Sequence, residues 1–184
     1  DGMFGENAVT FLHTKIEYGS PRWQISLATS FKKNPVATDN YDGYFHTAAA
    51  DGMTGGDITA LGLRAYWKPE TTGAIPSLQF GYDTASISDA AVDAVDSTAG
   101  WMVGLTWDDV LIDGNKAGLA LGSRQHATGY NGTGRDIAED NRVWEAYYTF
   151  RVNDGVTVTP AVFGGKDVEV EDTDVNGAVL LTEF

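Results

Sequence analysis

The 184-residue sequence contains no cysteine, so it offers no disulfide, no thiolate metal ligand and no thiol nucleophile. Basic residues are few: 12 Lys and Arg stand against 26 Asp and Glu, for a net charge of -14. Nucleic-acid binding is therefore not expected, because phosphates need cationic partners. No apolar run approaches the roughly 20 residues of a transmembrane helix. With 22 Gly, 5 Pro and 11% aromatic residues, the composition is not that of a helical protein.

What the sequence does contain is alternation with a period of two. Over residues 22–32, Trp23, Ile25, Leu27 and Phe31 alternate with polar or small residues, as in a strand whose two faces differ. This run has the length of a tilted membrane-spanning strand, about 9–11 residues. Comparable patterns predict nine strands, with no convincing helix between them, over residues 8–18, 22–32, 58–68, 77–84, 100–108, 117–125, 142–152, 156–164 and 176–184.

The pattern predicts an all-β fold, an antiparallel transmembrane β-barrel whose apolar side chains face lipid. Aromatic residues cluster at the predicted strand ends, as in the girdles of outer-membrane barrels: Tyr18, Trp23, Phe31, Trp67, Tyr82, Trp101, Trp107, Trp144 and Phe150. The opposite faces are small and polar, which suits a wall that faces water. A soluble all-β domain that buries its apolar faces as a core is the alternative.

The predicted connections alternate in length. Short turns are expected at 19–21, 68–76, 109–116 and 153–155, and longer loops at 33–57, 86–98, 126–141 and 165–175. Outer-membrane barrels have short periplasmic turns and long external loops, so we expect 33–57 outside the cell and 19–21 in the periplasm. Phe184 then ends the last predicted strand on the short-turn side.

Two stretches carry a resemblance to a known family: 104–123 (GLTWDDVLIDGNKAGLALGS) and 144–163 (WEAYYTFRVNDGVTVTPAVF). They resemble the carbohydrate-selective, OprB-type porins, and the cyanobacterial branch in particular, whose members carry an S-layer-homology domain before the barrel. Together the two stretches cover about a quarter of the chain. One departure is the sequence GGKD over 164–167, followed by an acidic run, where the family often has a short loop with Asn-Pro.

The resemblance implies a barrel of roughly sixteen strands in a bacterial outer membrane, preceded by a peptidoglycan-binding domain. Nine strands cannot form such a barrel. Residues 1–184 are therefore expected to be one domain, the carboxy-terminal portion of the barrel, incomplete at its amino-terminal end. Peptidoglycan would be bound only through the missing domain.

A porin needs no catalytic residue, since its function is a water-filled lumen lined by polar side chains. Strand parity gives the pore-lining candidates Lys15, Glu17, Arg64, Asp83, Arg124, Glu145 and Arg151. Opposite charges across a pore would orient polar solutes; alternatively, the same residues pair along the wall and hold strands in register. Tyr66, Tyr147 and Phe163 share this parity, but most aromatics do not, which weakens the expectation of a sugar track.

The predicted long loops are acidic, and an acidic vestibule concentrates cations; weak cation selectivity at low salt is therefore expected. Oxygen ligands at a spacing compatible with Ca²⁺ occur at Asp167, Glu169, Glu171, Asp172 and Asp174. The run lacks the glycine and full spacing of an EF-hand, and a solvated acidic loop is the favoured interpretation. Apart from this Ca²⁺ candidate, no cofactor is expected.

The sequence therefore predicts a diffusion channel rather than an enzyme; His126, Ser123 and Asp136 are the one catalytic combination available. The expected partners are outer-membrane lipid, small hydrophilic solutes or ions, and further copies of the chain in a homotrimer. Two other functions stay open: a structural or adhesive outer-membrane barrel with acidic cation-binding loops, and a soluble all-β binding module.

Overall fold

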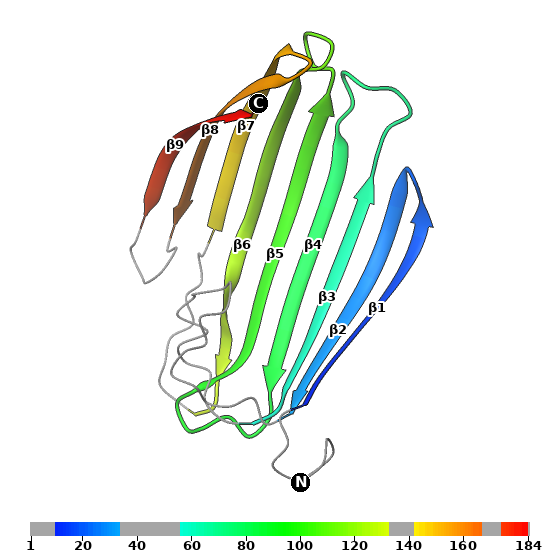
Figure 1. The fold of residues 1–184 in the computed structure, drawn as a ribbon. Helices are drawn as coiled ribbons and strands as arrows, with labels where there is room; N and C mark the ends of the chain where they lie inside the picture. The colour runs from blue at the N-terminus through cyan, green and yellow to red at the C-terminus, as the bar shows by residue number, and fades with distance from the viewer. Residues whose placement is uncertain (1–9, 34–55, 133–141, 167–173, 184) are drawn as a thin grey trace.

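The computed structural model describes residues 10–33, 56–132, 142–166 and 174–183. In these ranges the chain forms strands and no helix (Figure 1). The strands are β1 (Thr10–Ser20), β2 (Trp23–Lys33), β3 (Ile58–Trp67), β4 (Ser77–Ile87), β5 (Val95–Asp108), β6 (Lys116–Tyr130), β7 (Arg142–Asn153), β8 (Val156–Lys166) and β9 (Val175–Glu183).

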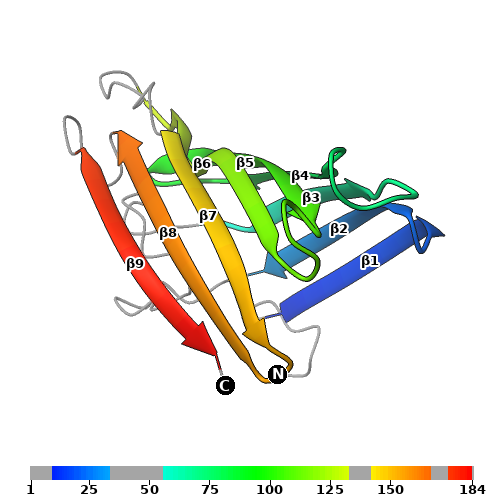
Figure 2. The same ribbon diagram turned by 90° about the horizontal axis from the view of Figure 1, so that it is seen from above.

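All nine strands belong to one antiparallel sheet, in which each strand pairs with the next along the chain. Figure 2 shows that the sheet is curved, with β1 and β9 at its two edges. The predicted all-β antiparallel architecture is thus confirmed. The described residues do not close it into a barrel, because β1 pairs only with β2 and β9 only with β8.

The register aligns the apolar residues of neighbouring strands into rows. One row runs from Tyr18 through Ile25, Ala65, Phe80, Val103 and Leu121 to Trp144. The next runs from Trp23 through Trp67, Leu78, Leu105, Leu119, Ala146 and Val162 to Ala178. We call the face with these rows the apolar face and the opposite one the polar face.

The apolar face is not covered by a second layer in the described part of the chain. Ile25 and Leu27 are 45% and 46% exposed, and Leu121 is 48% exposed. A buried apolar cluster lies elsewhere, near the 88–94 connection, where β4 and β6 end and β5 begins. It comprises Ile87, Ala90, Val95 and Ala127. Within the described residues this cluster lies at one end of the sheet and does not extend along the apolar face.

Three strands, β4, β5 and β6, are longer by three or more residues than the sequence pattern predicted. β4 continues to Ile87, β5 begins at Val95 and β6 continues to Tyr130, so the long loop expected at 86–98 is reduced to residues 88–94. The extensions are rich in Ala, Ser and Thr, which give little contrast between faces. As a consequence Tyr82 and Trp101 lie inside β4 and β5, and the prediction that they mark strand ends is wrong.

A β-bulge interrupts the alternation in β6. Ser123 lies opposite Trp101, but His126 lies opposite Ala99, so Arg124 and Gln125 together face Gly100. A bulge adds a residue on one strand and shifts its side chains relative to the sheet. Gln125 therefore joins Thr98 on the polar face, although the period of two assigned it to the apolar one.

Candidate functional site

The polar face combines charged side chains with closely approaching backbone. Glycines lie on it in four adjacent strands: Gly62, Gly81, Gly104, Gly118 and Gly122. Arg64 of β3 lies flat against this surface, because a Cβ on Gly81 would come within 3.3 Å of its Cδ. Small residues therefore let a long side chain follow the sheet rather than project from it.

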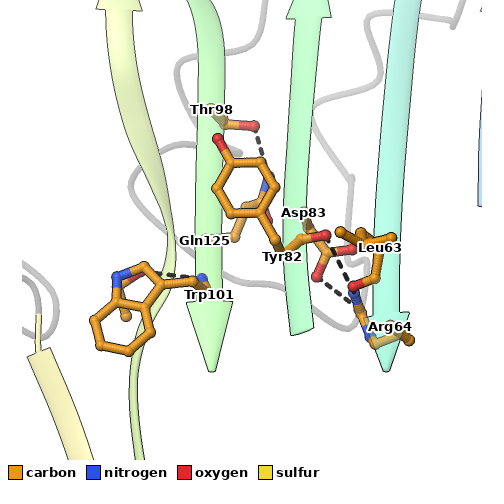
Figure 3. Close-up of polar contacts among 8 residues, drawn as sticks. Leu63, Arg64, Tyr82, Asp83, Thr98, Trp101 and Gln125 are labelled. Carbon is orange, nitrogen blue, oxygen red and sulfur yellow. Dashed lines mark hydrogen bonds and ion pairs between the residues drawn. The ribbon is translucent and has the colours of Figure 1, made fainter. Parts of the chain in front are cut away.

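Arg64 forms the best-defined polar contact of this face. Its Nη2 lies 2.6 Å from Oδ2 of Asp83, and Nη1 donates to the carbonyl oxygens of Leu63 and Tyr82 at 2.9 and 3.3 Å. Figure 3 shows the guanidinium reaching across to the carboxylate on the neighbouring strand. Both side chains remain about half exposed, so this pair is solvated and contributes modestly to stability.

Three more of the predicted charges, Lys15, Glu17 and Arg151, also form ion pairs. Lys15 pairs with Glu17 along β1, and Arg151 pairs with Asp154 in the β7–β8 turn at 2.7 Å. A further ion pair joins Lys116 to Asp108 at 3.3 Å, and these two residues were not among the predicted ones. The sequence could have predicted this pair, because the two residues flank the β5–β6 turn and therefore lie opposite each other. The charges are thus arranged as adjacent ion pairs rather than as separate cationic and anionic rows.

Glu145 of β7 lies opposite Ala120 on β6 and Phe163 on β8. The side chain is exposed, and within the described residues no ion pair or hydrogen bond holds its carboxylate. Phe163 and Tyr147 occupy the same face nearby. The third aromatic residue predicted there, Tyr66, lies at the short-turn end, where its hydroxyl donates to the Ser20 carbonyl oxygen.

The bulge in β6 creates a buried polar contact that sequence reasoning missed. Gln125 Nε2 donates to Thr98 Oγ1 at 2.7 Å, and Thr98 is fully buried. Figure 3 shows this contact on the strand next to the Arg64–Asp83 pair. Arg124, the pore-lining candidate at the bulge, is partly buried. The residue pattern around 124 and 125 did not predict the bulge.

The short-turn end is fixed by polar side chains. Asn115 is 2% exposed; its Nδ2 donates to the Tyr148 hydroxyl at 3.0 Å, and its Oδ1 accepts from the Arg151 amide at 2.9 Å. Asp109 accepts from the Gly114 amide at 2.8 Å. That hydrogen bond is the largest cause that lowers the pKa of Asp109 below its ordinary value, and a hydrogen bond with the Thr72 side chain is the second largest.

The metal and catalytic candidates receive no geometric support. Asp167, Glu169, Glu171 and Asp172 lie outside the described residues, and Asp174 is exposed. The described residues contain no group of three or more potential metal ligands. Ser123 Oγ accepts from the Trp101 amide, and a ring nitrogen of His126 lies 2.9 Å from the Arg124 carbonyl oxygen; Asp136 also lies outside the described residues.

In the described ranges, no helix has both the length and the apolar character needed to cross a membrane. Comparison with protein-family models, curated proteins and solved structures finds no match to this chain.

Proposed function

We propose that the sheet is part of the wall of a bacterial outer-membrane porin, a water-filled diffusion channel for small hydrophilic solutes and ions. The observation that carries this proposal is the apolar face. Two unbroken rows of apolar and aromatic residues cross most of the sheet, and most of their side chains are exposed. Because the described chain provides nothing to cover them, lipid is the environment that suits them best.

Strand length and the opposite face agree with this proposal. The strands contain 9 to 15 residues, and about 9–11 suffice to cross a bilayer when tilted. The opposite face carries solvated charges and glycines, which suit contact with water. On this proposal the polar face lines the lumen.

The proposal is tested with the complete protein in a planar bilayer. Stepwise conductance increases are expected, and the protein should require detergent for extraction from the membrane fraction. Extraction in salt or carbonate without detergent would instead indicate a soluble all-β module.

One observation favours a second candidate, a structural barrel that does not conduct. Most charges of the polar face are neutralised in adjacent ion pairs, an arrangement that also suits a wall packed against other protein. Detergent-dependent extraction without any conductance would support this candidate over the channel.

A further inference from the structure

The part of the polar face that β7, β8 and β9 form differs from the rest in its chemistry. Glu145 and Tyr147 of β7 and Phe163 of β8 lie there, and we call these three residues the aromatic–carboxylate patch. We propose that this patch binds organic ammonium ions that carry an apolar group. The proposal rests on the proposed function, because that function makes the polar face the path of the solute.

The first argument is charge. Glu145 faces Ala120 on one neighbouring strand and Phe163 on the other. The next residues of the polar face on those strands are Gly118, Gly122, Ala161 and Gly165, none of which is charged. Unlike Glu17 and Asp83, which have cationic partners, Glu145 thus presents an uncompensated carboxylate to a solute.

The second argument is the position of the two rings. A Cβ on Gly118 would collide with the ring of Tyr147, and a Cβ on Gly177 would collide with the ring of Phe163. Tyr147 therefore leans toward β6 and Phe163 toward β9, each filling the space above a glycine. Because Tyr147 and Phe163 lean toward strands on opposite sides of Glu145, they leave its side chain exposed.

The third argument is the apolar surface beside the patch. Val179 and Leu181 of β9 share the polar face with Phe163 through their pairing with Ala161 and Thr159, and they are 52% and 53% exposed. A carboxylate, aromatic rings and an aliphatic strip together match a cation with an attached hydrocarbon group. A small inorganic cation would use only the carboxylate, and a neutral sugar would gain nothing from its charge.

The experiment measures block of the potassium current through the complete porin by benzyltrimethylammonium in a planar bilayer. Block is expected at millimolar concentration. Glu145→Gln should weaken it about two- to fivefold, as expected for an exposed ion pair, and Phe163→Leu by a similar factor through loss of the cation–π contact. The potassium conductance without the blocker is measured first in each variant, and block is expressed as the fraction of that current that is lost.

The matched control is Glu183→Gln. Glu183 lies on the same face of β9, six residues from Gly177, or about 20 Å along the strand, and it accepts a hydrogen bond from Thr157. Its removal should leave the block unchanged at 0.1 M salt, where charges are screened beyond about 10 Å. A block that Glu145→Gln and Phe163→Leu leave unchanged, or one that glucose produces equally well, would overturn the proposed site.

If the wild-type protein carries no current, the proposed channel function is wrong, and the patch is tested without it. Saturation-transfer NMR with benzyltrimethylammonium on the detergent-solubilised complete protein reports binding directly. A signal that Glu145→Gln weakens supports the site even then. A signal that is absent from the wild type, or that the substitution leaves unchanged, contradicts it.

Discussion

A substitution at Leu27 can test whether lipid or a protein core covers the apolar face. It lies in register with Ile16 and Leu63 and is 46% exposed. If lipid covers it, Leu27→Arg should cost roughly 2–4 kcal/mol near the bilayer midplane and reduce the amount of folded protein in the membrane fraction. Heat-resistant folded species on a gel and urea unfolding in micelles measure this loss.

The control for Leu27→Arg belongs on the polar face, and the structure changes which residue is suitable. Ser26, next to Leu27, lies on the polar face, but it is buried and directly opposite Arg64, so an arginine there would meet a like charge. Gln79 is exposed on the same face, and Gln79→Arg should fold normally. Equal tolerance at Leu27 and Gln79 would contradict the assignment of the two faces.

Substitutions at Arg64 and Asp83 test whether this pair lines the ion path, because they should shift ion selectivity in opposite directions. Arg64→Gln leaves the carboxylate uncompensated and should increase cation preference; Asp83→Asn should shift preference toward anions. The double variant should return near the wild-type value, because the pair is neutral as a unit. Reversal potentials across a salt gradient report all three, and unchanged values in both single variants would place this pair outside the path.

At the scale of the strands and turns, Asn115 joins the β5–β6 turn to β7. It is nearly fully buried and bonded to Tyr148 and Arg151, so Asn115→Ala leaves the partly buried Arg151 amide without its acceptor. A loss of about 1–3 kcal/mol in unfolding free energy is expected, measured by urea denaturation of the detergent-folded protein.

Asn153→Ala is the comparison for that change. Asn153 also accepts from a backbone amide, that of Gly155, but at an exposed position where water can replace it. The loss should be less than half of that at Asn115. Equal losses would mean that burial does not determine the contribution of Asn115.

The β5–β6 turn is also expected to depend on pH through Asp109. Hydrogen bonds from Gly114 and Thr72 lower the pKa of Asp109. The ionised carboxylate therefore stabilises the turn fully at pH values above the ordinary aspartate pKa, and this stabilisation is lost as the pH falls through the lowered pKa. The Gly114 amide shift should titrate at that lowered value in NMR. Asp109→Asn should remove the titration; a wild-type titration at the ordinary value would contradict the hydrogen-bonded geometry.

The number and positions of the strands could largely be predicted from the sequence. All nine strands were predicted because large apolar residues such as Leu27, Val103 and Leu119 recur at every second position. The extensions of β4, β5 and β6 were missed where Ala, Ser and Thr remove that contrast. The bulge at Arg124 and Gln125 was missed because two consecutive polar residues do not reveal a change of register.

The candidate site was less predictable than the elements. The alternation of residues along each strand placed Arg64, Asp83 and Glu145 on one face. Which of these charges form ion pairs depends on the register between strands and on the space that a glycine such as Gly81 leaves for a long side chain. Which carboxylate stays uncompensated is therefore a property of neighbouring strands rather than of any local motif. The predicted Ca²⁺ ligands at 167–172 lie outside the described residues and stay a prediction.

For the whole molecule, the two ends of the sheet should lie on opposite sides of the membrane. Because the chain has no cysteine, single substitutions give unambiguous labelling. Val92, 80% exposed in the 88–94 connection, and Asp154, whose side chain is 98% exposed in the β7–β8 turn, lie at opposite ends. On intact cells, an impermeant thiol reagent should label Val92→Cys and not Asp154→Cys.

Lysed cells provide the control for this labelling, since both cysteines should then react. Labelling of Asp154→Cys alone on intact cells would reverse the proposed orientation. Labelling of both would contradict a membrane-spanning sheet.

The order of the strands restricts how this sheet can be completed. With antiparallel neighbours throughout, β1 and β9 run in the same direction, so joining these edges directly would make a parallel pair. A second copy inserted in the same orientation would meet the same mismatch. A closed and fully antiparallel wall therefore needs an odd number of additional strands, and the two outermost of these must run opposite to β1 and β9.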